Sequence, residues 1–248
     1  MTADITRVGV VGCGLMGSGI AEVCARAGLD VMVREVNAAA AEAGHKRVTA
    51  SLDRAVRAAK LGEDERDAAL KRVHLTTDWA EMADRQLVVE AVIEDEALKT
   101  ETFAALDKVV SDPGAILASN TSSIPIMKLG MATQRPEQVV GIHFFNPVPV
   151  LRLVELVTSL LTSPDTTDRA NAFATDVLHK RVVRSQDRAG FIVNALLIPY
   201  ILSSIRMMES GFASAEDIDT GMVEGCNHPM GRSASPTSSA STRARPWP

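Results

Sequence analysis

The sequence predicts an α/β fold: a doubly wound, mostly parallel β-sheet, followed by an all-α segment. Short apolar runs alternate with longer helical segments as far as residue 187, which is typical of βα units that build a parallel sheet. Beyond that point the apolar runs stop and the chain reads as helix. We therefore expect one domain over residues 1–187, the start of a helical domain over residues 188–231, and an aberrant tail over residues 232–248.

The first βα unit contains a glycine-rich turn. A short β-branched run of Val8, Val10 and Val11 leads into glycines at positions 12, 14 and 17, and residues 20–27 then read as a helix. In a dinucleotide fold these three glycines make the tight turn, leave room for the pyrophosphate and let helix pack on strand. The free amides at the helix start favour phosphate. The alternative is a βαβ unit that binds no nucleotide.

An acidic residue follows the second apolar run. Glu35 lies about 20 residues beyond the glycine turn, where a carboxylate accepts hydrogen bonds from the adenosine ribose. Its charge favours NAD over NADP, because it repels a 2′-phosphate, while the adjacent Arg34 weakens that preference. Together with the turn, this predicts a Rossmann-like domain that binds NAD.

A helical hairpin is predicted between the second and third strands. Residues 38–61 are alanine-rich without proline, Gly62 breaks the pattern, and residues 63–72 form a second helix. The pair is longer than an ordinary connection, so we expect an insertion that projects from the sheet. Its basic side chains form either a solvated face or an arm for a phosphorylated substrate: Arg47, Arg54, Arg57 and Lys60.

The remaining elements follow the same alternation. Predicted strands cover residues 73–76, 87–93, 115–118, 139–143, 153–157 and 181–185, and predicted helices cover 96–110, capped by Asp95, and 165–178. In the helical segment, residues 190–211 form a long apolar helix interrupted at Pro199, and Ser214 opens another helix through a capping box.

Composition excludes several classes of protein. The net charge is −5 and no basic tract stands out, which argues against a nucleic-acid partner. Cys13, Cys24 and Cys226 show neither metal-ligand spacing nor an even number, so we expect a reducing compartment, no disulfide and no metal. With neither a signal peptide nor a membrane-spanning run, the expectation is a soluble cytoplasmic protein.

One histidine stands where chemistry is expected. His143 closes an apolar strand, and open α/β sheets bind ligands beyond the carboxyl ends of their strands. Glu155 lies in the next apolar run, where a buried carboxylate needs a partner. A His–Glu pair fixes the imidazole tautomer, as a general base acting on an alcohol requires. The alternatives are a structural histidine and a solvated glutamate.

Two polar features accompany the pair. Residues 119–123, which include Ser122, follow a strand and can bind a substrate oxygen or the nicotinamide end of a cofactor, or simply cap the next helix. Asn194 is a lone amide within an apolar run and must find a partner. It either ties two domains together or reaches the reacting carbonyl.

These motifs together resemble the 3-hydroxyacyl-CoA dehydrogenase family, in particular its bacterial 3-hydroxybutyryl-CoA dehydrogenases. Six stretches carry the resemblance in the family's order from Arg7 to Gly231: VGCGLMGSGIA, VVEAVIED, ASNTSSIPI, GIHFFNPVPVLRLVE, GFIVN and ASAEDIDTGM with its following HPMG. The resemblance implies a Rossmann-like domain, then a helical domain that forms a homodimer, with the active site in the cleft between the two.

The resemblance also implies residue roles. His143 matches the catalytic base and Glu155 its orienting partner, while Ser122 and Asn194 match residues that help bind the substrate oxygen. Positions that match the surroundings of NAD are Gly12, Gly14, Leu15, Met16, Gly17, Glu35, Glu94, Lys99, Ser122 and Asn146. Ser51 and Lys60 match the arm that holds coenzyme A.

The implied reaction is the oxidation of an L-3-hydroxyacyl-CoA, in particular 3-hydroxybutyryl-CoA, by NAD to the 3-oxoacyl-CoA. His143 takes the hydroxyl proton while hydride leaves C3, and Glu155 stabilises the imidazolium. A different class of function is a catalytically weak or silent nucleotide-binding remnant, or a crystallin-like protein of the same fold. A dehydrogenase of a free hydroxy acid is a further alternative, against which Ser51 and the basic arm argue.

The match to the family pattern stops after Gly231. Residues 232–248 read RSASPTSSASTRARPWP, a low-complexity composition that would not fold. Codons exist for this stretch that encode PLGVTDLIGLDTGKAMA when read one base earlier. We therefore hypothesise a frameshift near Arg232, which the gene's nucleotides can test. The expected consequence is a shortened helical domain, weak activity and poor dimerisation.

Overall fold

The computed structural model describes residues 5–228 of the chain. It divides into two compact units, the first ending at Phe191 and the second beginning at Ile192. The predicted tail over residues 232–248, and residues 229–231 before it, lie outside the described residues.

The first unit is built on a single eight-stranded sheet. Its strands are β1 (Arg7–Val11), β2 (Asp30–Arg34), β3 (Val73–Thr76), β4 (Leu87–Glu90), β5 (Ile116–Ser119), β6 (Val139–Phe144), β7 (Leu153–Thr158) and β8 (Arg181–Gln186). They are ordered β3-β2-β1-β4-β5-β6-β7-β8, and every neighbouring pair is parallel except β6 and β7. The predicted doubly wound, mostly parallel sheet is confirmed, with β7 and β8 extending it.

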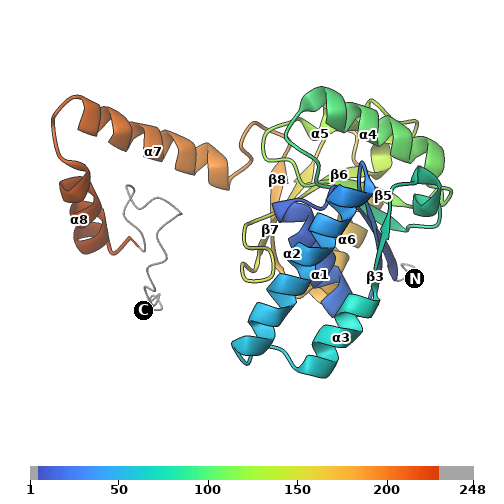
Figure 1. The fold of residues 1–248 in the computed structure, drawn as a ribbon. Coiled ribbons are helices and arrows are strands. Elements are labelled where there is room, and N and C mark those ends of the chain that lie inside the picture. The colour runs from blue at the N-terminus through green and yellow to red at the C-terminus, as the bar shows by residue number, and fades with distance from the viewer. Residues whose placement is uncertain (1–4, 229–248) are drawn as a thin grey trace. The chain divides into compact units, whose positions relative to one another are not determined.

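Helices cover both faces of this sheet (Figure 1). They are α1 (Leu15–Arg26), α2 (Ala38–Arg57), α3 (Glu63–Lys71), α4 (Glu96–Val109), α5 (Ile126–Gly130) and α6 (Pro164–Ala172). Alternate residues of a strand point to opposite faces of the sheet and pack in different hydrophobic clusters. Val10 packs in the cluster that contains Ile20 of α1, whereas Val11 packs in the cluster that contains Phe103 of α4. This burial on both faces explains why the strands read as continuous apolar runs.

The predicted helical hairpin is present as α2 and α3, which project from the sheet (Figure 1). α2 ends at Arg57, earlier than the predicted residue 61, because Ala59 adopts a positive φ of 53° that turns the chain back. The strand predicted over residues 87–93 likewise ends early, at Glu90. Asp95 caps α4 as predicted, since its Oδ1 accepts a hydrogen bond from the amide of Leu98 at 2.8 Å.

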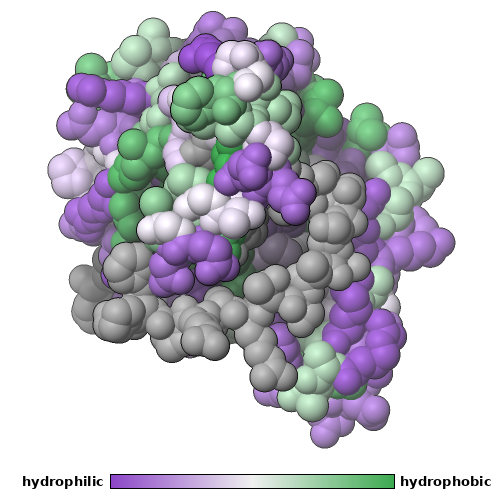
Figure 2. Space-filling model, turned by 90° about the vertical axis from the view of Figure 1, so that its left-hand side faces the viewer, coloured by the Kyte–Doolittle hydropathy of each residue, from purple (hydrophilic) through white to green (hydrophobic). Residues whose placement is uncertain are grey.

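The second unit contains α7 (Val193–Glu209), with Pro199 inside it, and α8 (Ala215–Cys226). Ser214 caps α8 as predicted, accepting from the amide of Asp217 at 3.1 Å. Apolar side chains of α7 are exposed, among them Leu196 at 71% and Ile198 at 50%. Figure 2 shows one face of the molecule, on which exposed hydrophobic residues lie among hydrophilic ones.

Candidate active site

The carboxyl ends of β1, β4, β5 and β6 meet at one edge of the sheet, because these strands are parallel. Gly12 follows β1, Glu90 and Ser119 end β4 and β5, and His143 is the last residue but one of β6. Ligands of open α/β sheets bind outside this edge, where the strand order reverses beside the first strand. The structure therefore gathers chemically active residues from distant parts of the chain at one place.

His143 and Glu155 form a buried pair at this edge. They are direct register partners on antiparallel β6 and β7, so their side chains lie on the same face of the sheet. Nδ1 of His143 lies 2.7 Å from Oε2 of Glu155, and the two side chains are 8% and 1% exposed. Because a carboxylate accepts hydrogen bonds, the contact favours the neutral tautomer in which Nδ1 carries the proton and Nε2 has the lone pair.

Aromatic rings hold the imidazole in place. The ring centre of His143 lies 4.6 Å from that of Phe145 and 5.6 Å from that of Phe191, the latter in an edge-on contact. Nε2 has no hydrogen-bond partner among residues 5–228. The arrangement leaves one basic nitrogen for a ligand, as a general base requires.

The glycine turn has the geometry of a pyrophosphate cradle. Gly12 has a φ of 88°, which favours glycine, and a Cβ on Gly17 would lie 1.8 Å from the carbonyl oxygen of Gly12. A Cβ on Gly14 would meet nothing within 4 Å, so open space lies beside that residue. Gly14 also begins α1 without a side-chain cap, which leaves the first amides, from Leu15 onward, for an anion.

Glu35 stands beside this turn. It follows β2, and its Oε1 accepts a hydrogen bond from the amide of Cys13 at 2.6 Å. The half-buried carboxylate is therefore within reach of a nucleotide on the cradle. The guanidinium of Arg34 stacks over the Trp79 ring, with 4.0 Å between Cζ and the ring centre. The residues present thus fit a dinucleotide.

A buried ionic network supports the same edge. The Nζ of Lys99 lies 2.6 Å from Oε1 of Glu90 and 3.4 Å from Oε2 of Glu94, and the Lys99 and Glu90 side chains are almost wholly buried. Ser119 Oγ donates to the other oxygen of Glu90 at 2.6 Å. Glu94, Lys99 and the polar stretch that begins at Ser119 are predicted from the sequence, whereas Glu90 is not. The missed signal was an acid inside an apolar strand, which demands a partner.

Glu94 organises the polar loop that follows β5. Its Oε1 accepts hydrogen bonds from the amides of Ser122 and Ser123 and from the hydroxyls of Thr121 and Ser123. Burial alone would raise the pKa of Glu94, but these hydrogen bonds and the charge of Lys99 outweigh it and lower the pKa. The Ser122 hydroxyl makes no hydrogen bond within the described part of the chain, which leaves it for a ligand.

Five predicted residues line one cavity of about 330 Å³: Leu15 of α1, Arg47, Ser51 and Arg54 of α2, and Asn146, which precedes a cis peptide bond to Pro147. Lys60 is exposed beyond α2 and does not line this cavity. Met16, on α1, is partly buried and packs against the core. Asn194 belongs to the second unit, so it is not among the residues that the first unit brings together.

Comparison with known proteins identifies the family. The model of the 3-hydroxyacyl-CoA dehydrogenase NAD-binding domain matches residues 7–188, and that of the family's C-terminal domain matches residues 190–234. The chain belongs to the 3-hydroxyacyl-CoA dehydrogenase family. As a member of this family, it carries the family's NAD-binding domain as its first unit.

Relatives in this family agree with that assignment. The chain is 60% identical to 3-hydroxybutyryl-CoA dehydrogenase of Mycobacterium tuberculosis, over 93% of this chain and 81% of the relative. It is 39% identical to human mitochondrial hydroxyacyl-coenzyme A dehydrogenase, over 92% of this chain and 74% of the relative. The crystal structure of M. tuberculosis FadB2 superposes with a TM-score of 0.91, covering 92% of this chain and 80% of that one.

Among residues 5–228 no group of three or more His, Cys, Asp or Glu side chains is arranged to hold a metal ion. No helix in the same range is both long and apolar enough to span a bilayer.

Proposed function

We propose that this dehydrogenase oxidises L-3-hydroxyacyl-CoA to 3-oxoacyl-CoA with NAD, and that 3-hydroxybutyryl-CoA is its substrate. The observation that carries the proposal is the buried His143–Glu155 pair, in a chain 60% identical to a 3-hydroxybutyryl-CoA dehydrogenase. The pair lies at the edge of the sheet that also holds the glycine turn.

The proposed mechanism assigns each group a step. Nε2 of His143 takes the proton of the substrate hydroxyl. NAD, held at the glycine turn, would supply the acceptor for the hydride that leaves C3. Glu155, 2.7 Å from Nδ1, stabilises the imidazolium that forms and keeps the ring in one orientation. In the reverse direction His143 donates the proton. General-base catalysis of this kind contributes about 10²–10⁴-fold to the rate.

Other residues position the reactants in this proposal. Ser122, whose hydroxyl is without a partner in the described chain, hydrogen-bonds the substrate oxygen and Asn194 assists it. In this proposal NAD is held by the glycine turn, by Glu35 at the ribose, and by the residues around Glu94, Lys99 and Asn146. Ser51 contacts the coenzyme A portion in the cavity it lines.

The test is NADH formation from 3-hydroxybutyryl-CoA by wild type and His143→Gln. We expect the substitution to lower kcat by about 10²–10⁴-fold, because the base is lost. The dissociation constant for NAD, measured by calorimetry, should stay unchanged. His74→Gln is the matched control, because His74 is exposed on β3 at the far edge of the sheet.

Three outcomes would contradict the proposal. Undiminished turnover by His143→Gln would remove the proposed base from the mechanism. NAD binding by the wild type without turnover would instead favour the silent nucleotide-binding alternative. Turnover of free 3-hydroxybutyrate at the rate of the CoA ester would show that the enzyme does not require a CoA ester and acts on free hydroxy acids.

We also propose a cytoplasmic location and a homodimer formed through the second unit. Exposed apolar side chains on α7, such as Leu196, support the second statement. The departure from the family pattern after Gly231 predicts that this chain's dimer is weak. Light scattering over a range of protein concentrations measures both the state and its strength.

A further inference from the structure

Two residues with opposite effects on the choice of cofactor are neighbours at the end of β2. A carboxylate at the adenosine ribose favours NAD, whereas an arginine beside it accommodates the 2′-phosphate of NADP. This chain has both, Arg34 and Glu35. The preference for one cofactor therefore depends on where the Arg34 side chain lies.

Arg34 and Glu35 point to opposite faces of the sheet. Arg34 is the register partner of Val11 on β1, whose side chain packs in the hydrophobic cluster on the α4 face. The Glu35 carboxylate instead turns to the glycine turn, where it accepts hydrogen bonds from the amides of Cys13 at 2.6 Å and Val36 at 3.0 Å. Among the residues that the structure describes, no ion pair joins Arg34 to Glu35.

Trp79 holds the Arg34 side chain on the α4 face. It opens η1 (Trp79–Met82), a short 3₁₀ helix between β3 and β4, and it is partly buried against the same cluster. Cζ of Arg34 lies 4.0 Å from the centre of the indole ring. The negative face of the ring attracts the guanidinium, so the arginine is fixed by a cation–π contact.

The Arg34 guanidinium makes no hydrogen bond within residues 5–228. Its Nε is buried without a partner, and its terminal nitrogens donate to no side chain or carbonyl in the same range. Burial lowers the pKa of Arg34, while the nearby charge of Glu35 raises it. Once the side chain leaves Trp79, all of its N–H donors are therefore available for a phosphate.

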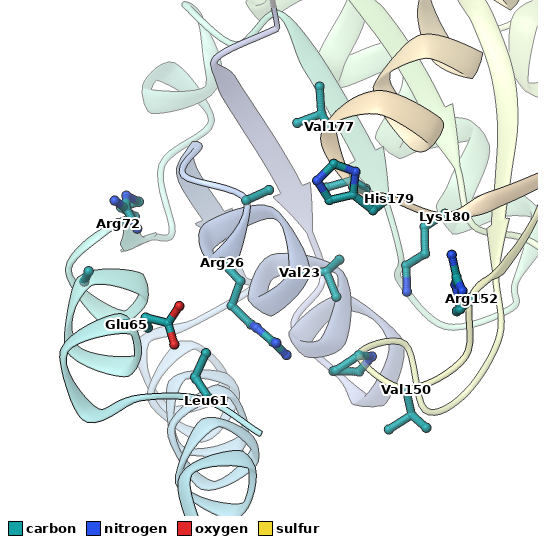
Figure 3. Close-up of a pocket in the computed structure, with 14 residues that line it drawn as sticks. Val23, Arg26, Leu61, Glu65, Arg72, Val150, Arg152, Val177, His179 and Lys180 are labelled. Carbon is teal, nitrogen blue, oxygen red and sulfur yellow. The ribbon is translucent and has the colours of Figure 1, made fainter. Parts of the chain in front are cut away.

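Two basic side chains elsewhere in the first unit have the oxygen acceptors that Arg34 lacks. A cavity of about 620 Å³ beside α1, shown in Figure 3, has basic side chains from α1, the turn after α3, the loop between β6 and β7, and the turn before β8: Arg26, Arg72, Arg152 and Lys180. Arg72 donates to the carbonyl oxygen of Ala25 at 3.3 Å, and Lys180 donates to that of Leu151 at 2.8 Å. Arg34 differs from these two because an aromatic ring takes the place of an oxygen acceptor.

We propose that Trp79 determines the choice of cofactor by holding Arg34 away from the adenosine ribose. With Arg34 on the indole ring, the charge of Glu35 is not neutralised and repels a 2′-phosphate. Without the ring, Arg34 is free to turn towards that phosphate, because the Cα atoms of adjacent residues are only about 3.8 Å apart and guanidinium binds phosphate through paired hydrogen bonds. The proposal rests on the cofactor half of the proposed function, NAD binding at the glycine turn, and not on the acyl-CoA substrate.

Calorimetry with NAD and NADP tests the proposal without turnover. Wild type should bind NAD more tightly than NADP. Trp79→Met should bind NADP about 10-fold more tightly than wild type does, with NAD affinity within about 3-fold, because only NADP offers the released arginine a phosphate at the ribose. Trp79→Phe keeps an aromatic face and should stay within about 3-fold of wild type for both cofactors.

Arg34→Gln separates release of the arginine from loss of packing at position 79. In the Trp79→Met protein this second substitution should abolish the gain in NADP affinity. In the wild-type background it should leave NADP affinity within about 3-fold, because Arg34 is held on the ring. Met82→Leu is the matched control, since Met82 lies in the same short helix and is buried in the same cluster but is not the aromatic partner of Arg34.

Unchanged NADP affinity in Trp79→Met, or a gain that persists after Arg34→Gln, would overturn the proposal. A gain of the same size in Trp79→Phe or Met82→Leu would do so too, because packing alone would then explain it. If thermal denaturation shows that Trp79→Met does not fold, the single variant Arg34→Gln decides. Weaker NADP binding by that variant would show that Arg34 already contacts the 2′-phosphate and would overturn the proposal, whereas unchanged binding would support it.

Oxidation of 3-hydroxybutyryl-CoA with NAD and with NADP gives a second readout. The ratio of kcat/KM for NADP to that for NAD should rise by about 10-fold in Trp79→Met. An unchanged ratio would count against the proposal. If no protein turns the ester over with either cofactor, the proposed substrate or base is wrong, and the dissociation constants for NAD and NADP still decide the role of Trp79.

Discussion

Buried charged side chains in this molecule occur in pairs, and the best-defined pairs lie at the carboxyl edge of the sheet. Glu90 and Lys99 are 0% and 1% exposed and only 2.6 Å apart. Removing one member of such a pair leaves the other charged without a partner in a medium of low polarity. Single substitutions in these buried pairs are therefore expected to change the stability of the protein strongly.

For the Glu90–Lys99 pair we expect Lys99→Met to lower the free energy of unfolding by about 3–5 kcal/mol, because Glu90 is left buried and unpaired. The double variant Glu90→Gln/Lys99→Met should recover part of that loss. Urea denaturation of wild type, Glu90→Gln, Lys99→Met and the double variant gives the coupling between the two side chains. Lys128→Met is the control, since its partner Glu96 is half-exposed and the pair contributes less than about 1 kcal/mol. Equal losses at both sites would contradict the assignment.

Glu22 predicts a pH dependence of stability. Burial raises its pKa above the ordinary value of 4.5, although a hydrogen bond from Ser51 and the charge of Arg26 act against the rise. A raised native pKa contributes stability below 4.5 and loses it as pH rises through the native value. The stability of Glu22→Gln relative to wild type should thus increase with pH from 4.5 upward and then level off.

Urea denaturation at a series of pH values measures this difference. Glu42→Gln, at an exposed position of α2, should show no such trend. A difference for Glu22→Gln that shrinks as pH rises would reverse the sign and contradict the argument.

At the scale of the element, the turn from β1 to α1 combines two different uses of glycine. Gly17 is required by packing, because any Cβ would overlap the backbone oxygen of Gly12. Gly14 is not required by packing, because nothing lies within 4 Å of its would-be Cβ. One glycine therefore serves the fold, and the other leaves space for a ligand.

This distinction predicts opposite behaviour of two alanine variants. Gly17→Ala should lower the free energy of unfolding by about 1–3 kcal/mol, because the backbone must shift. Gly14→Ala should leave stability within about 0.5 kcal/mol of wild type but weaken NAD binding, because the methyl enters the pyrophosphate space. Thermal denaturation and calorimetry with NAD measure the two properties. Normal NAD affinity in Gly14→Ala would place the cofactor elsewhere.

At the scale of the whole molecule, the described core belongs to the first unit. Its buried apolar side chains all lie between Ile5 and Phe191. The second unit, from Ile192, contributes exposed apolar side chains of α7 instead. Stability and cofactor binding should therefore depend on the first unit, and catalysis on both.

A chain ending at Phe191 tests this division. We expect it to keep the melting temperature and NAD affinity of the full chain, because it retains the core and the glycine turn. Turnover should be lost, because the proposed substrate residue Asn194 is removed. Aggregation of the shortened chain, or loss of its NAD binding, would show that the second unit stabilises the first.

The order of the strands, the hairpin and the glycine turn could be predicted because each depends on a local pattern. Valine-rich runs predict buried strands, and glycine spacing predicts the turn. Strand and helix ends were less predictable, as at Ala59, because they depend on backbone angles that no neighbouring residue dictates. The position of Glu90 inside an apolar strand signals that it needs a partner, but nothing local to β4 reveals that Lys99 and Ser119 are the partners.

By itself the sequence determined the fold class, the family resemblance and the identity of the candidate residues, since these depend on residue types in a fixed order. The tertiary structure decided which residues meet: His143 faces Glu155 because β7 runs antiparallel to β6 in that register. It also decided that positive charges from four separate segments line one cavity and that Arg47 and Arg54 of the predicted arm line another, whereas Arg57 and Lys60 are exposed. Such juxtapositions arise from long-range packing, which a linear pattern does not contain.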